Sequence, residues 1–240
     1  MWRSIVTGLG LTAALAAAVP ASAQDQAVSF NIGYFALRGA DSRVDGDVLN
    51  ANRCIDSTSA CEPLLFEVDD FNNATFGAEW LVGLGEFFEA GAGIAFHQRT
   101  VHSVYENLTN VNGSEIEQDL KLRLVPFTAT GRFVPTGRHA AIQPYIGAGV
   151  ALINWEYSEV GSFVDTSTGD IFNARYPADG NEVGPLVLGG LRGPVGNNLL
   201  IGGEVRYQWA DVTLPSEVGF VGDRLDLGGF TYQAVFQIRF

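Results

Sequence analysis

The chain has 240 residues, with 27 acidic against 14 basic side chains and a formal net charge of −13. This acidic balance argues against nucleic acid as a partner, because phosphates require basic patches. Hydrophobic residues make up 47% of the chain, yet no apolar run approaches the length of a membrane-spanning helix. Inner-membrane helices are therefore not expected.

The first 23 residues have the pattern of a secretory signal peptide. Arg3 supplies a short positive start, residues 5–19 are apolar and uncharged, and Ala21-Ser22-Ala23 forms a small-residue cleavage site. We therefore expect export, with a mature domain over residues 24–240.

The two cysteines, Cys54 and Cys61, lie close together in the chain. In an oxidising periplasm this spacing favours a disulfide. A metal site would need more ligands: Asp56 and Glu62 are near, but no histidine is. We predict a disulfide, no metal and no cofactor.

The mature chain contains eight segments in which apolar and polar residues alternate, as in β-strands with two different faces. In residues 27–38, Phe30 and Ile32 share one face while Ser29 and Asn31 share the other. The other seven segments span about residues 74–84, 87–105, 116–134, 140–158, 183–193, 198–212 and 224–240.

In the second segment Trp80 is predicted to face outward and Glu79 inward. The alternation leaves the facing of side chains open near Pro126, Pro185 and Gly228, and a bulge at Pro126 would shift it.

The connections between the segments are alternately long and short. Polar stretches at about residues 39–73, 106–115, 159–182 and 215–223 alternate with short turns near residues 85–86, 135–138 and 194–197. This asymmetry predicts an all-β fold: an eight-stranded antiparallel transmembrane up-and-down β-barrel, with short periplasmic turns and long extracellular loops. A soluble β-sandwich or lipocalin-like barrel is the alternative.

Large aromatic residues near the strand ends fit the girdles that membrane barrels place at the two lipid–water interfaces. The expected girdle residues are Tyr34, Trp80, Phe88, Trp155, Tyr207, Trp209 and Tyr232.

The last segment reads FTYQAVFQIRF, and its apolar face carries Tyr232, Phe236, Ile238 and the terminal Phe240. It resembles the closing strand of bacterial outer-membrane barrels, where such a strand is the assembly signal. With the signal peptide, the eight strands and glycine-rich stretches such as residues 144–149, the chain resembles the small OmpA/OmpW-like outer-membrane β-barrel family.

This resemblance implies location in the outer membrane of a Gram-negative bacterium. It also implies contacts with membrane lipid and lipopolysaccharide, and recognition by the barrel-assembly machinery through the C-terminal strand. No periplasmic domain is expected after the barrel, so peptidoglycan anchoring is not implied. The acidic first loop is expected to be solvated or to bind divalent cations that bridge lipopolysaccharide phosphates.

An eight-stranded barrel is narrow enough for side chains to fill it. The alternation places charged residues of both signs inside, and buried charges must be paired to be tolerated. The candidate lumen charge network consists of Glu79, Glu89, Arg99, Lys121, Arg123, Glu204, Arg206 and Arg239. We expect a salt-bridged plug; a gated path for polar or small solutes is the alternative.

Catalysis has little support in the sequence. His102 and Ser103 are the only suggestive pair, but neighbouring residues on a strand point to opposite faces. No nucleophile elbow is present, and the glycines of residues 91–93 and 147–149 do not complete a dinucleotide fingerprint. The sequence thus favours a non-enzymatic barrel with a structural or surface role, with no catalytic residues. The alternatives are a porin-like channel for small or hydrophobic solutes and a lipid-modifying enzyme.

Overall fold

The computed structural model describes residues 26–55, 62–165 and 167–240. The predicted signal peptide and Cys61 lie outside these residues, so the cleavage site and the Cys54–Cys61 disulfide stay predictions. The helices of the described part are α1 (Val48–Asn52) and the 3-10 turns η1 (Ala40–Ser42) and η2 (Val68–Phe71). None of these described helices has the length and apolarity needed to cross a membrane.

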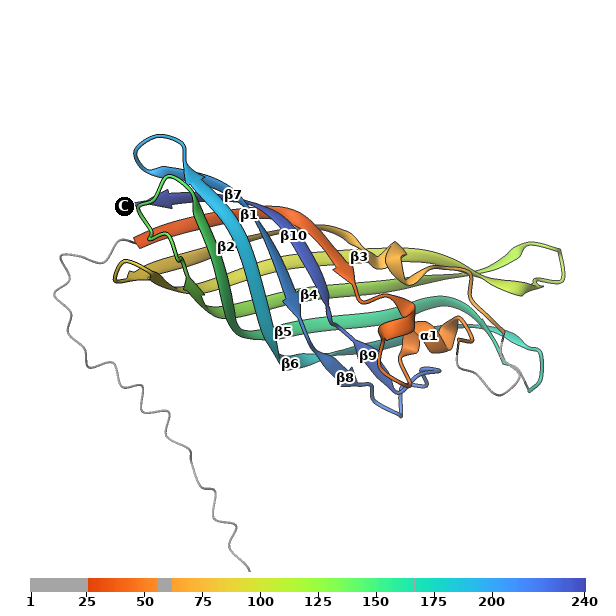
Figure 1. Ribbon diagram of the computed structural model, residues 1–240. Coiled ribbons are helices and arrows are strands. Elements are labelled where there is room, and N and C mark those ends of the chain that lie inside the picture. Colours follow the sequence, from red (N-terminus) through yellow and green to blue (C-terminus); the bar gives the residue numbers. More distant parts are fainter. Residues whose placement is uncertain (1–25, 56–61, 166) are drawn as a thin grey trace, which may run out of the picture.

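Eight antiparallel strands close into a ring, as predicted (Figure 1). They are β1 (Gln26–Leu37), β2 (Asn73–Leu84), β3 (Phe88–Thr109), β4 (Glu115–Phe133), β5 (Gln143–Val164), β6 (Ile171–Pro194), β7 (Leu199–Gln208) and β10 (Gly229–Arg239). β1 closes the ring by pairing with β2 on one side and with β10 on the other. Closure leaves no sheet edge, so the strands satisfy one another's backbone hydrogen bonds.

Strands β3 to β6 continue far beyond the ring at one end, where they form two long hairpins (Figure 1). The polar loop predicted over residues 159–182 is therefore wrong: Glu159 pairs with Tyr176 within the β5–β6 hairpin. The segment resembled a loop because many of its residues are polar, and most of those at the start of β6 are exposed. The same end carries α1 and a small sheet of β8 (Asp211–Thr213) and β9 (Arg224–Asp226).

No bulge occurs at Pro126 in the described β4. Its pairing with β5 runs without a shift from Gln118 to Phe133, and buried residues recur at even positions from Ile116 to Arg132. Near Gly228 the last predicted segment does divide, into β9 and β10, with the Asp226 carboxylate accepting from the Gly228 N–H at 2.8 Å.

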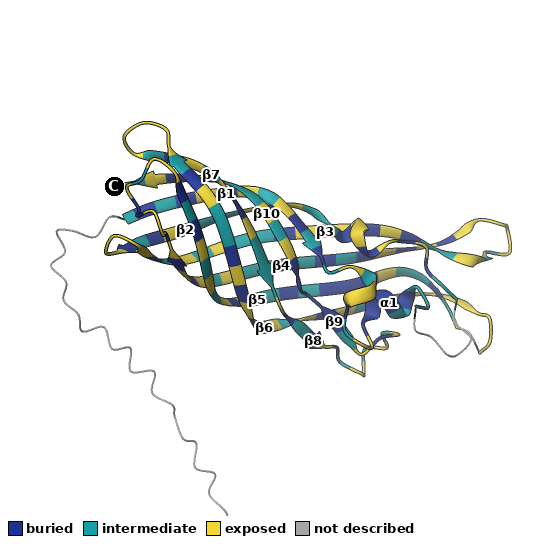
Figure 2. Ribbon diagram, viewed as in Figure 1, coloured by how far each residue is buried: buried dark blue, intermediate teal, exposed yellow. Residues whose placement is uncertain are grey.

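Buried and exposed residues alternate along every strand of the ring (Figure 2). Phe30, Ile32 and Trp80 point outward and are about half exposed, whereas Ser29 and Glu79 on the inner face are buried. The ring is thus apolar outside and polar inside, the reverse of a soluble protein.

Most of the predicted girdle residues lie on the outer surface, but Trp155 does not. Its side chain is 4% exposed and belongs to an apolar core inside the barrel. It lies on the inner face of β5 with Ile153 and Tyr157, in the half of the barrel where the interior becomes apolar.

Candidate functional site

The interior of the ring contains two charged clusters. The lower cluster lies near the end of the ring with the short turns, and the middle cluster lies further toward the end with the long hairpins. The lower cluster is built on Arg192, which donates to Glu89 at 2.6 Å, to Gln143 at 3.1 Å and to Gln237 at 2.7 Å. Arg239 donates to the same Gln143 oxygen at 3.0 Å. These side chains come from four strands, β3, β5, β6 and β10, so the cluster ties the wall together across the lumen.

The middle cluster is centred on Glu79. Its Oε2 accepts from both Arg132 and Arg206 at 2.6 Å, and Thr130 donates to its Oε1 at 2.8 Å. Arg132 also pairs with Glu204 at 3.0 Å, and Arg206 forms a second ion pair with Glu204. Two carboxylates and two guanidiniums therefore balance in a buried, hydrogen-bonded arrangement, which is the condition for tolerating such charges.

Tyr145 connects the two clusters. Its hydroxyl donates to Glu204 at 2.9 Å, and its ring lies 5.2 Å from the guanidinium of Arg132 and 5.1 Å from that of Arg192. A ring between two cations attracts both through its π face. The two clusters thus form one continuous plug of side chains.

Inward glycines make room for this plug. A Cβ at Gly91 would clash with Glu79 and lie 2.6 Å from Thr130 Oγ1, and one at Gly190 would lie 2.5 Å from the Tyr145 hydroxyl. Larger residues at these two positions would displace the plug.

Of the predicted network, the structure places Glu79, Glu89, Glu204 and Arg206 in the lumen, and Arg239 at its rim. The central cations Arg132 and Arg192 were missed by sequence reasoning. Arg132 follows Pro126 and Arg192 follows Pro185, and near both prolines the sequence left open which side chains point inward. Continuing the alternation without a shift through each proline would have placed both arginines in the lumen.

Three members of the predicted network lie elsewhere. Lys121 and Arg123 are on the outer face of β4, where Arg123 pairs with Glu156 at 3.0 Å. Arg99 is exposed and donates to the backbone oxygen of Asp70 at 2.9 Å. The prediction was wrong for Lys121 and Arg123 because in this part of β4 the leucines, not the charges, face inward.

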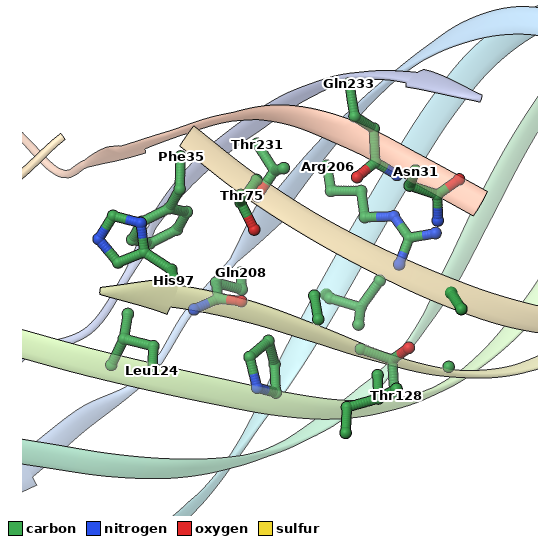
Figure 3. A pocket seen from close by; sticks show the side chains of 16 residues that line it. Asn31, Phe35, Thr75, His97, Leu124, Thr128, Arg206, Gln208, Thr231 and Gln233 are labelled. Carbon is green, nitrogen blue, oxygen red and sulfur yellow. The ribbon is translucent and has the colours of Figure 1, made fainter. Parts of the chain in front are cut away.

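Above the middle cluster lies a cavity of about 40 Å³. Figure 3 shows Phe35 and His97 side by side at one end of it, and Arg206 near Asn31 at the other. The rings of Phe35 and His97 pack edge to face at 4.9 Å between centroids. The interior thus changes here from charged to apolar.

An apolar plug fills the barrel beyond the cavity. Leu120, Leu122 and Leu124 of β4 and Ile153, Trp155 and Tyr157 of β5 form its walls, all buried. The first loop covers it from above with Val48 and Leu49 of α1 and with Phe71 of η2. Tight apolar packing of this kind excludes water.

A buried ion-pair network joins the part of this cover that contains α1 to the last loop. We call residues 38–52, together with β8 and β9, the lid. Arg43 donates to both oxygens of Asp47 at 2.7 and 2.9 Å, and Asp47 caps the start of α1 by accepting from Leu49 N at 3.0 Å. Asp47 also accepts from Asp226 N at 2.7 Å, and Arg38 pairs with Asp226 at 3.0 Å. The first and last loops are thereby joined across the mouth of the barrel.

His102 and Ser103 face opposite sides of β3, as expected. Ser103 points inward and donates to Leu65 O at 3.2 Å, while His102 lies outside and is paired with Asp119 on β4. The hydrogen bond that His102 donates to the Asp119 carboxylate, together with the negative charge of that carboxylate, raises the pKa of His102. The two side chains therefore do not form a nucleophile–base pair.

No protein-family profile and no curated protein matches the sequence. Among solved structures, the barrel is similar to Neisserial surface protein A, at 11% identity and a TM-score of 0.45, covering 90% of this chain and 96% of that one. It is also similar to the N-terminal β-barrel domain of Pseudomonas aeruginosa OprF, at 10% identity and 0.42, covering 90% and 97%. A third is the E. coli outer membrane protein W, at 12% identity and 0.41, covering 89% and 97%. Likenesses this distant carry no conclusion about function.

Proposed function

We propose that this protein is an integral outer-membrane β-barrel with a structural or surface role, whose lumen is closed by its own side chains. The observation that carries the proposal is the inverted distribution of polarity in a closed ring. Large apolar side chains cover the outer face and ion pairs fill the inner one. In water such an outer surface would drive aggregation, whereas lipid accepts it once the ring has no edge.

The outer surface has aromatic residues at both ends of the ring. Tyr34 and Tyr232 are cross-strand partners near the lid end, and Phe88 and Phe133 pack at 5.3 Å near the opposite end. All four are exposed. Two such belts support a lipid-facing band between them. A lipocalin-like barrel, which would hold an apolar lumen, fits the buried charges around Glu79 poorly.

Insertion in lipid predicts different quenching of two tryptophans. Trp80 is 54% exposed on the outer face of β2, whereas Trp155 is 4% exposed inside the barrel. In vesicles with brominated acyl chains, a variant that keeps only Trp80 is expected to lose most of its fluorescence, and one that keeps only Trp155 very little. Equal quenching of the two would contradict a lipid-facing outer surface.

A closed lumen predicts the absence of a steady conductance. The two charged clusters, the apolar plug and the lid obstruct the barrel in succession. In a planar bilayer, protein whose gel mobility changes on boiling is expected to give no reproducible step. A regular step conductance would instead favour the channel for small or hydrophobic solutes.

The C-terminal strand supports the proposed recognition by the assembly machinery. Tyr232, Phe236, Ile238 and Phe240 are exposed on one face of the strand or at its end. The same face would contact lipid, and the long hairpins on the lid side would lie among lipopolysaccharide headgroups. A lipid-modifying activity has no support from the geometry of His102 and Ser103.

A further inference from the structure

A second cavity, unconnected with the lumen clusters, lies in the hairpin region beyond the ring. It has a volume of about 160 Å³. It is lined by the first loop, by β3, by the β5–β6 hairpin, and by Gly219 and Val221 of the last loop. Among its side chains are Glu62, Tyr105, Glu159, Phe163 and Tyr176. It is therefore assembled from four parts of the chain that are far apart in sequence.

Glu159 is the central feature of this cavity, because it is a buried carboxylate without a cation. Its side chain is 2% exposed, and its Oε1 accepts from Asn52 at 2.7 Å and from the Tyr157 hydroxyl at 2.9 Å. Its Oε2 accepts no hydrogen bond within the described residues. No lysine, arginine or histidine of the described chain pairs with it, although every other buried carboxylate discussed above has an arginine partner.

Burying an unpaired carboxylate costs free energy, and desolvation raises the pKa of Glu159. Its two hydrogen bonds come from neutral donors, so they offset only part of the cost of removing the charged carboxylate from water. The carboxylate is thus poised to gain from a positive charge placed in the cavity.

The walls of the cavity are aromatic. Phe163 packs edge to face against Tyr176 at 4.9 Å and lies 6.3 Å from Phe172, measured between ring centroids. Tyr105 lines the cavity as well, and its pKa is raised by burial and by the nearby carboxylates of Glu159 and Glu62. Aromatic faces beside a carboxylate attract organic cations, most strongly where water is excluded.

A metal ion fits this donor set poorly. Hard divalent cations take six to eight oxygen ligands, and the described residues contain no cluster of three or more histidine, cysteine or acidic side chains suited to a metal. An alkyl or quaternary ammonium group matches both the aromatic walls and the single buried carboxylate.

We propose that this cavity is a binding site for a small organic ammonium ion, with Glu159 as its counter-ion, Glu62 as a second carboxylate near it and Tyr105, Phe163 and Tyr176 as the aromatic walls. The site would face the outside of the cell if the barrel is oriented with its long hairpins outward. It requires neither an open lumen nor any catalytic step.

Isothermal titration calorimetry of the full-length folded barrel in a non-ionic detergent tests the site. Phosphocholine detergents are avoided because they carry the same cation. The probes are choline, n-butylammonium and 3,3-dimethylbutanol, the uncharged isostere of choline. We expect at least one cation to bind, and the alcohol to bind about tenfold more weakly or not at all.

The key variant is Glu159→Gln, which keeps an oxygen to accept from Asn52 and Tyr157 while removing the charge. It is expected to fold, shown by unchanged heat-dependent gel mobility, and to bind the cation at least about tenfold more weakly. Glu156→Gln is the matched control: it removes the same charge three residues away on the outer face of β5, and it should bind like the original protein.

Tyr176→Leu keeps an apolar wall without the π face and is expected to weaken binding of choline several-fold. The proposal is overturned if neither cation binds at up to about 10 mM, if the alcohol binds as tightly as choline, or if Glu159→Gln leaves the affinity unchanged.

Discussion

Replacing Glu79 with glutamine is expected to lower the free energy of unfolding by about 3–5 kcal/mol. The carboxylate accepts from Arg132 and Arg206 at 2.6 Å and from Thr130 at 2.8 Å, and it is fully buried. Without its charge, two buried guanidiniums share the single carboxylate of Glu204. Urea unfolding in lipid vesicles, followed by the shift in gel mobility, measures the loss.

Two further variants distinguish a charge imbalance from a general effect of substitution. Glu86→Gln, in the exposed turn after β2, should change stability little. Adding Arg206→Met to Glu79→Gln restores one cation to one anion, so the double variant should be more stable than the sum of the single effects implies. Strict additivity, or an unchanged midpoint for Glu79→Gln, would mean that the cluster is not a coupled unit.

The ring could be predicted from the sequence because its two environments differ sharply. An apolar outer face and a narrow polar lumen impose a strict alternation, and Trp80 next to Glu79 on β2 is its clearest instance. Period-two patterning needs no knowledge of partners. The strand count and the antiparallel connections follow from it.

The half of the barrel next to the hairpins was harder to predict. Its interior is apolar instead of polar, although the same alternate residues still point inward. Even-numbered residues of β4 point inward throughout, from Leu120 and Leu122 in the apolar plug to Arg132 in the charged cluster. Assuming a polar interior everywhere therefore placed Lys121 and Arg123 on the wrong face. Alternation shows which residues share a face of the strand, but it does not show which of the two faces points into the barrel.

No local sequence pattern predicted the lid or the proposed ammonium cavity, because their contacts join residues far apart in the chain. Asp47 bonds to Asp226 N across 179 positions, and Asn52 reaches Glu159 across 107. The acidic residues of the first loop resembled ordinary solvated charges, and only folding of that loop onto the barrel mouth separates buried Asp47 from exposed Asp45. Contacts of this range depend on the closed fold.

Replacing Asp47 with alanine is expected to unfold the lid locally while leaving the ring intact. The side chain is 1% exposed and accepts from Arg43, Leu49 N and Asp226 N. Its loss removes a helix cap worth about 1 kcal/mol and leaves the buried guanidinium of Arg43 without its carboxylate, which costs about 3–5 kcal/mol. Lid amides, such as that of Leu225, should exchange with solvent roughly a thousand times faster.

Asp45→Ala is the matched control, because Asp45 lies two residues away and is exposed; its amide exchange should resemble that of the original protein. Opening the lid is not expected to produce conductance, since Glu79, Arg132 and Arg192 still fill the lumen below. If Asp47→Ala gave a steady conductance, the lid alone would close the barrel and the charged clusters would leave a path for ions. If exchange were accelerated equally in β1 and β10, the lid and the ring would unfold together.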